Sequence, residues 1–140
     1  GLGFEEIFWQ VKQKPGKPIY FSKTREGKFL FGLPGNPASA LVCFYEYVRP
    51  ALLAFMGSRT PFLKAWKVPL ANPFHKKKGL RHFLKGRLVA RQGRPAVEIL
   101  DRQASHMMTS FAAADCLVAV PEETAEVKEG DEVEVHLLPQ

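Results

Sequence analysis

The sequence predicts a protein in two parts, a piece of an α/β domain followed by a small all-β module. Residues 1–57 hold short apolar strand patterns and one long amphipathic helix. Residues 62–140 hold short apolar runs separated by turn signals. Regular short strands without long helices are typical of a small β-barrel or sandwich. We therefore place a domain boundary in the breaker sequence at residues 58–62.

The first part is predicted to contain helix, hairpin and helix in that order. Apolar residues at helical spacing in residues 3–12 indicate the end of an amphipathic helix, stopped by Pro15-Gly16. Residues 18–21 and 28–32 are predicted strands joined by a polar turn. A long helix from residue 38 is expected to kink at Pro50 and to end at Gly57.

The second part is predicted to contain five strands and one short helix. The helix covers residues 105–115. The strands are residues 66–71, 83–91, 96–100, 116–120 and 132–138. We expect the core of this module to be aliphatic and to contain Val68, Leu88, Val89, Val97, Ile99, Leu117, Val118, Val133 and Val135.

Composition excludes several classes of protein. No apolar run approaches the ~20 residues that cross a bilayer, and the first residues lack the pattern of a secretory signal. The two cysteines, Cys43 and Cys116, and the four histidines show no metal-ligand spacing, so neither a metal site nor a disulfide scaffold is expected. These features favour a cytoplasmic protein without a membrane partner.

The net charge of +6 is unevenly distributed. Residues 64–102 carry 11 Lys/Arg and 2 Asp/Glu, whereas residues 103–140 carry 1 Lys/Arg and 8 Asp/Glu. This split indicates either a basic surface for an anionic partner or charges that pair across neighbouring strands. Trp66, Phe74 and Phe83 do not form the adjacent aromatic pair typical of RNA-binding sheets, so we expect no nucleic-acid partner.

The sequence LPGNPAS (33–39) is a rigid junction between a strand and the long helix. Asn36 is a strong N-cap and Pro37 a strong first helical residue. Gly35 allows either a positive φ or close approach of a ligand. With the Ser39 hydroxyl, free N–H groups of the first helical turn would suit an anion. The alternative is a capped turn with no further role.

A second turn, KPGK, places Lys14 and Lys17 on either side of Pro15-Gly16. It precedes a strand that is expected to neighbour the LPGNP strand. A basic turn beside a helix N-terminus would strengthen attraction for an oxyanion. The alternative is a pair of ordinary solvated lysines.

These motifs together resemble one family. KPGKP followed by GLPGNPASALVCFYEYVRPAL, then RHFLKGRL, RQASHMMTSFAAADCLVAVPEE and VKEGDEVEVHLL, is similar to the molybdopterin molybdenumtransferases, which include bacterial MoeA and the E-domain of gephyrin. The resemblance extends over essentially the whole chain. It implies that residues 1–57 are the second half of a MogA-like molybdopterin-binding α/β domain and residues 62–140 a C-terminal β-barrel domain.

The resemblance also implies an activity. Family members use Mg²⁺ to release AMP from adenylylated molybdopterin and insert molybdenum from molybdate. Their Mg²⁺ ligands lie in earlier segments, so no metal ligand is assigned here, and we expect this chain alone to be inactive. The matching positions are Lys14 and Lys17 as catalytic residues and, as substrate-binding residues, Pro18, Pro34, Gly35, Asn36, Pro37, Ser39, Lys85 and Ser105.

Two of these matches have competing interpretations. Many relatives have arginine where this chain has Lys85, and lysine cannot form a bidentate contact to an oxyanion. Arg81 or Arg87 is the candidate replacement. Ser105 is either a substrate contact or a plain helix N-cap.

The family's assembly implies a partner as well. Its members are homodimers whose site is shared between subunits, so Lys14, Lys17 and residues 34–39 would face Lys85 and Ser105 of a second chain. The alternative function, based on the gephyrin branch, is a non-catalytic scaffold module that dimerises and binds a peptide.

Overall fold

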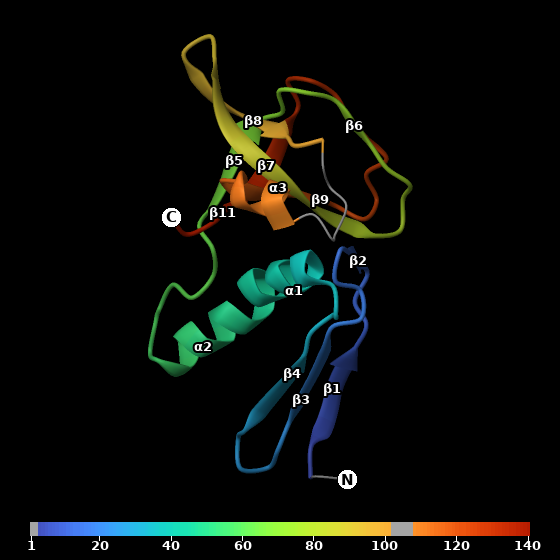
Figure 1. Ribbon diagram of the computed structural model, residues 1–140, viewed down its shortest axis with the longest axis vertical. Coiled ribbons are helices and arrows are strands. Elements are labelled where there is room, and N and C mark those ends of the chain that lie inside the picture. Colours follow the sequence, from blue (N-terminus) through green and yellow to red (C-terminus); the bar gives the residue numbers. More distant parts are fainter. Residues whose placement is uncertain (1–2, 102–107) are drawn as a thin grey trace.

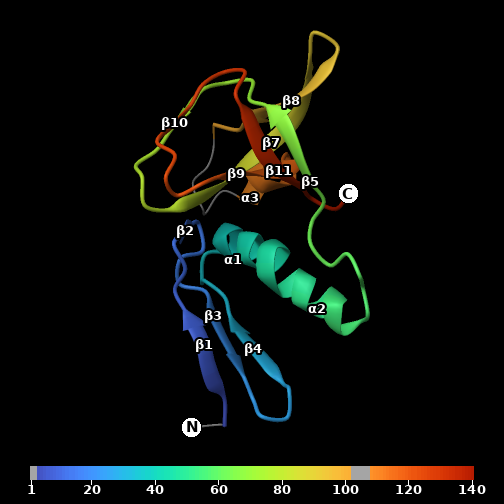
Figure 2. The same cartoon turned by 180° about the vertical axis from the view of Figure 1, so that it is seen from behind.

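The protein is described here by a computed structural model that places residues 3–101 and 108–140. Its two parts are stacked along the long axis, with a small sheet at one end, a β-barrel at the other and a helical segment between them (Figure 1). The view from behind shows the same order, with the helical segment beneath the barrel (Figure 2).

The small sheet is antiparallel and contains three strands in the order β1-β3-β4, with bounds Glu5–Trp9, Tyr20–Lys23 and Phe29–Gly32. The helix predicted for residues 3–12 is therefore wrong. Phe8 pairs with Phe21 across the sheet, and Phe21 stacks on Phe31 at 4.7 Å between ring centroids. A bulge between Glu6 and Phe8 interrupts the alternation that would have marked a strand, while cross-strand aromatic contacts stabilise one.

The two hairpin strands are confirmed, displaced by one or two residues from the predicted bounds. Gly27, in the turn between β3 and β4, has a φ of 83°, and its N–H donates to the Thr24 carbonyl at 3.1 Å. The polar turn predicted here is thus a turn that uses glycine's conformational freedom.

The long helix is present but changes its hydrogen-bond pattern partway along. It runs as α1 (Pro37–Cys43), the π-helical turn η1 (Phe44–Val48) and α2 (Arg49–Phe55). The Arg49 N–H bonds to the Phe44 carbonyl, five residues back, just before Pro50, which has no N–H to donate. The irregularity expected at Pro50 is therefore a π-turn preceding it. Gly57, with a φ of 85°, ends the helix as predicted.

The barrel contains five antiparallel strands in the order β8-β7-β9-β11-β5. A parallel bridge between Leu70 and Val97 closes the ring, and the Ala71 N–H donates to the Val97 carbonyl at 2.7 Å. The small β-barrel is therefore confirmed. All five predicted strands are found, as β5 (Ala65–Pro69), β7 (Arg81–Arg91), β8 (Arg94–Ile99), β9 (Cys116–Val120) and β11 (Glu132–Leu137).

Six of the nine predicted core residues lie inside the barrel. Leu88 packs at its margin. Leu117 is fully buried on the outer face instead, and Val89 is only half-buried. Alternating residues of a strand face opposite sides, so a strand covered on both faces buries every residue, as β9 does. The predicted residues found in the interior cluster are Val68, Val97, Ile99, Val118, Val133 and Val135.

The two parts of the chain are joined by packing and by backbone pairing. Ala38 and Val42 of α1 pack on the outer face of the barrel, against Phe83 and Leu117 and against α3 (Met108–Ala112). The short strand β2 (Gln13–Lys14) pairs in parallel with β7. Two further short strands, β6 (Phe74–His75) and β10 (Glu126–Val127), pair with each other. The boundary at residues 58–62 stays a prediction.

Candidate anion-binding site

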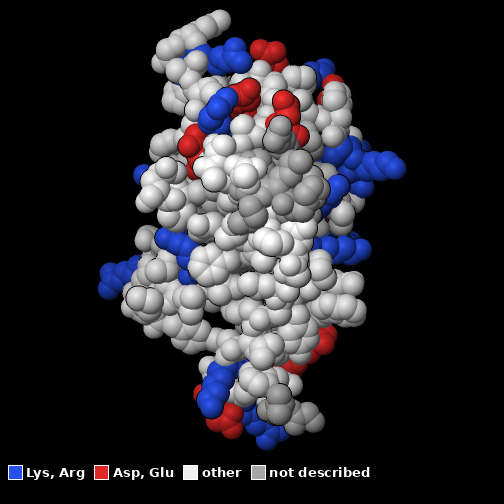
Figure 3. Space-filling model, viewed as in Figure 1, with Lys and Arg blue, Asp and Glu red and all other residues white. Residues whose placement is uncertain are grey.

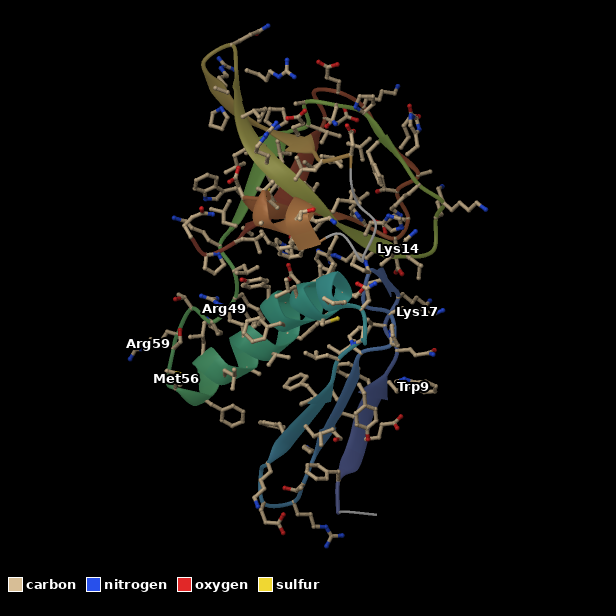
Figure 4. All side chains as sticks on the ribbon, in the orientation of Figure 1. Trp9, Lys14, Lys17, Arg49, Met56 and Arg59 are labelled. Atoms are coloured by element: carbon tan, nitrogen blue, oxygen red, sulfur yellow. The ribbon has the colours of Figure 1, made fainter. Side chains whose placement is uncertain are left out.

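The KPGK turn lies where the small sheet meets the barrel. Its first lysine belongs to β2 and pairs with His82 of β7. The turn folds back on itself, because the Val11 N–H donates to the Lys17 carbonyl at 2.9 Å and the Ile19 N–H to the Gly16 carbonyl at 3.2 Å. Lys14 and Lys17 are both exposed, and Figure 4 shows them at this junction, away from Met56 and Arg59 at the far end of the helix.

Three side chains beneath the turn fix its shape. Gln13 is 2% exposed and donates to the Pro15 carbonyl at 3.0 Å, and its amide oxygen accepts a hydrogen bond from the Tyr47 hydroxyl. The Cys43 thiol lies 3.7 Å from the Gly16 carbonyl. Burial raises the pKa of Cys43 to about 11, so this thiol is a neutral packing group. The sequence places Cys43 and Tyr47 four residues apart on one helix face, but this spacing does not by itself indicate that the turn packs against them.

Gly16 is the position that only glycine fits. Its φ is +94°, and an added Cβ would lie 2.5 Å from the Cys43 sulfur and 2.9 Å from the Gln13 amide nitrogen. Residues that carry a side chain rarely adopt this backbone conformation, and the two neighbours, Cys43 and Gln13, are held in place. The shape of the basic turn therefore depends on Gly16.

A cleft of about 1110 Å³ lies between this turn and the β6–β7 connection. It brings together four of the predicted site residues, Lys14, Lys17, Pro18 and the buried Ser39. The other wall comes from the barrel. The remaining lining residues are Gln13, Pro15, Gly16, Phe74, His75, Lys76, Lys77, Lys78, Leu80, His82, Phe83 and Leu84.

The cleft is strongly basic. Among its described lining residues are five lysines and two histidines, with no aspartate or glutamate. Burial, and then the charges of Lys76 and Lys14, lower the pKa of His82, so its imidazole is neutral at neutral pH. Tetrahedral oxyanions suit such a lining because ammonium groups form strong charge-assisted hydrogen bonds to them.

Of the LPGNPAS junction, only Ser39 reaches this cleft. The Asn36 side-chain oxygen accepts from the Ala38 N–H at 3.2 Å and Pro37 is the first residue of α1, so both capping predictions are confirmed. Gly35 does not have a positive φ, so the first of its two interpretations is wrong, and close approach of a ligand stays a prediction. An added Cβ at Gly35 would meet nothing within 4 Å. Substrate binding by Pro34, Gly35, Asn36 and Pro37 stays a prediction.

Lys85 is not among the described residues that line the cleft, although its neighbours Phe83 and Leu84 are. It is 4% exposed on β7, opposite Leu117, and burial lowers its pKa. Neither candidate replacement lines the cleft. Arg81 lies 3.6 Å from Glu134 and stacks over Phe83, and Arg87 pairs with Glu98 at 3.0 Å. Ser105 falls outside the described residues.

A polar network ties the helix to the barrel on the side of η1. His136 of β11 hydrogen-bonds through Nδ1 to Glu46 at 2.6 Å and through Nε2 to Glu134 at 2.7 Å. Burial alone would lower the pKa of His136, but the hydrogen bonds and charges of Glu46 and Glu134 outweigh it and raise this pKa. The hydrogen bond from His136 in turn lowers the pKa of Glu134. The sequence did not reveal this network, because Glu46 lies 90 residues from His136 along the chain.

The fold defines a class, an α/β segment joined to a small β-barrel. Residues 67–138 match the MoeA C-terminal region (domain IV), and residues 1–54 match a probable molybdopterin binding domain. The chain belongs to the MoeA family, as its motifs predicted.

The names of known proteins similar to the chain agree with this family assignment. It is 35% identical to the molybdopterin molybdenumtransferase of Haemophilus influenzae over 94% of this chain and 34% of that protein. It is 33% identical to molybdopterin molybdenumtransferase 1 of Mycobacterium tuberculosis, over 99% of this chain and 34% of that protein. A solved MoeA protein from Pyrococcus horikoshii superposes with a TM-score of 0.78 at 32% identity. The superposition covers 96% of this chain and 32% of that protein. The chain thus spans about a third of the length of these relatives.

Proposed function

We propose that the protein containing this chain is a molybdopterin molybdenumtransferase of molybdenum cofactor biosynthesis. It accepts adenylylated molybdopterin and molybdate, inserts the metal and releases AMP. The observation that supports this best is the basic cleft that Lys14, Lys17 and Ser39 line, in a chain of the MoeA family. The relatives' names are those of transferases, so the scaffold alternative is not favoured.

The chemistry of the cleft suits the anionic half of this reaction. Molybdate is a tetrahedral dianion, and the pterin carries a phosphate. Lys14 and Lys17, on a turn of fixed shape, offer ammonium donors to one such anion, and Ser39 offers a hydroxyl from the first turn of α1. Holding the anion at a fixed position reduces the entropy lost when it meets the pterin.

The cleft does not suit the magnesium ion that the family uses. Mg²⁺ prefers carboxylate and water oxygens, whereas the described lining is basic. Within residues 3–101 and 108–140 there is no group of three His, Cys, Asp or Glu residues that would hold a metal ion. We propose that Mg²⁺ ligands are supplied by segments outside this chain, and no step is assigned to the metal here.

The direct test is molybdate-dependent AMP release by the whole protein. We expect release that requires Mg²⁺ and falls when either Lys14 or Lys17 is replaced by alanine. The purified chain alone is expected to show no release. Activity of the isolated chain, or full activity of both lysine variants, would contradict this assignment.

We also propose that the whole protein is a cytoplasmic homodimer with a shared site, and that neither nucleic acid nor a membrane is its partner. Contrary to the expectation from the sequence, residues 37–55 are long and apolar enough to span a membrane, but α1 packs on the barrel and Glu46 bonds to His136. Subunit mixing tests the shared site. A Lys17→Ala chain and a Ser105→Ala chain, each impaired alone, should regain activity as a heterodimer. Heterodimers without regained activity would place the whole site in one chain.

A further inference from the structure

The far wall of the cleft carries basic groups that the motif comparison did not assign. Lys76, Lys77 and Lys78 lie in the connection between β6 and β7 and line the same cleft as Lys14 and Lys17. Figure 3 shows basic side chains along one edge of the molecule, at the level of this connection and of β2. This connection belongs to the basic stretch of residues 64–102, whose role the sequence left open.

The connection is held in a defined conformation. The Lys76 ammonium donates to the Leu80 carbonyl at 2.9 Å and to the Glu122 carbonyl at 3.3 Å, and the Gly79 N–H donates to the same Glu122 carbonyl at 2.9 Å. The Lys76 N–H donates to the Ala125 carbonyl at 2.9 Å. Lys76 therefore holds the connection in place, and Lys77 and Lys78 stay exposed at the cleft.

The charges of the two exposed lysines are not neutralised locally. Lys77 and Lys78 are exposed, and within the described part of the chain neither ammonium has an ion-pair partner. The same holds for Lys14 and Lys17 on the opposite wall. Four cations without acidic partners around one concavity attract anions more strongly than four isolated surface lysines do.

Size decides which anion the two walls fit together. A cleft of about 1110 Å³ is slightly larger than the usual range for organic ligands, roughly 300–1,000 Å³, and far larger than one tetrahedral anion. Molybdate on the KPGK wall would leave the opposite wall empty. The opposite wall therefore has the room and the positive charge for a second anionic group, and adjacent phosphoryl groups of an organic ligand fit it. Phe74, which also lines the cleft, offers an aromatic surface beside the lysines.

We propose that Lys77 and Lys78 form a binding site for the diphosphate group of a nucleotide-like substrate. This inference rests on the proposed function, in which the adenylylated substrate contains a diphosphate linkage. In that arrangement Lys14 and Lys17 hold molybdate, and Lys77 and Lys78 hold the diphosphate, whose P–O–P linkage is hydrolysed by one water molecule to give AMP and a phosphate monoester on the pterin.

The test uses inorganic pyrophosphate as the probe and isothermal titration calorimetry of the purified chain at low salt. The Lys77→Ala/Lys78→Ala variant should bind pyrophosphate about tenfold more weakly, as expected for lost charge-assisted contacts. The matched control is Lys23→Ala/Lys28→Ala, which removes the same charge from the β3–β4 hairpin and should change affinity by less than about twofold. Equal losses in both variants, or none in the first, would overturn the proposal.

A second measurement separates this proposal from the proposed function. In the whole protein, Lys77→Ala/Lys78→Ala should raise KM for adenylylated molybdopterin about tenfold while KM for molybdate changes by less than about twofold. Equal increases in both constants would contradict a diphosphate site. A wild-type protein that releases no AMP would refute the proposed function alone, and pyrophosphate binding by the chain would still decide this inference.

Discussion

The two proline-glycine turns of this chain look alike in sequence and differ in structure. In KPGK, Gly16 is buried, has a φ of +94° and touches Cys43. In LPGNP, Gly35 is exposed, does not have a positive φ and has open space around it. The residues beneath the KPGK turn determine its shape. The LPGNP turn is the capped N-terminus of a helix, and its glycine is open to solvent. A Pro-Gly pair therefore indicates a turn but not how tightly it is built.

The largest expected effect comes from giving both glycines a side chain. Gly16→Ala should lower the free energy of unfolding by about 2–5 kcal/mol, from backbone strain and a clash with a fixed neighbour. Gly35→Ala should stay within about 0.5 kcal/mol of wild type. Urea unfolding of the two variants checks this directly. Similar losses at both positions would remove the distinction between the turns.

The next effect concerns function at the first turn. In the whole protein, Lys17→Ala should reduce molybdate-dependent turnover by about 10- to 150-fold, the equivalent of a charge-assisted contact worth ~1.5–3 kcal/mol. Its stability should barely change, because the lysine is exposed. Lys23→Ala, on the β3–β4 hairpin, is the matched control and should retain activity. A Lys17→Ala enzyme as active as this control would show that the turn's charge is not used.

A smaller effect should follow from removing one support of the KPGK turn. Tyr47→Phe leaves the buried amide oxygen of Gln13 without its donor, which should cost about 1–3 kcal/mol. Tyr45→Phe is the control, since within the described residues the Tyr45 hydroxyl has no hydrogen-bond partner. Thermal or urea unfolding gives the two values. A Tyr47→Phe protein as stable as the control would show that Gln13 does not need this contact.

The smallest effect is on the pH dependence of stability, and it concerns the helix that supports the first turn. Because the folded-state pKa of His136 is raised, its stabilising contribution is complete below about pH 6.5, its unfolded value, and is lost as pH rises through the folded pKa. We expect a decrease of about 0.5–1.5 kcal/mol across that interval. Urea unfolding from pH 6 to 9 measures it. In His136→Gln, which does not titrate, this decrease should disappear, and an unchanged pH profile would exclude His136 as its cause.

Much of the fold was determined by local sequence. The barrel strands lie close to their predicted positions because short apolar runs between turn residues have few other ways to bury their side chains. The caps at Asn36, Pro37 and Gly57 follow from backbone preferences that act within one helical turn. The family was recognisable for the same reason, since its motifs are contiguous.

Only the tertiary structure decided the rest. Residues 5–9 form a strand because Phe8 meets Phe21 across the sheet, an interaction absent from the segment itself. The cleft joins Lys14 and Lys17 to Lys76–Lys78, and the His136 network joins two elements 90 residues apart in sequence. Local pattern fixes where a strand or turn forms, but distant side chains meet through packing of whole elements. That is why the sequence identified the basic turn and the structure alone supplied its opposite wall.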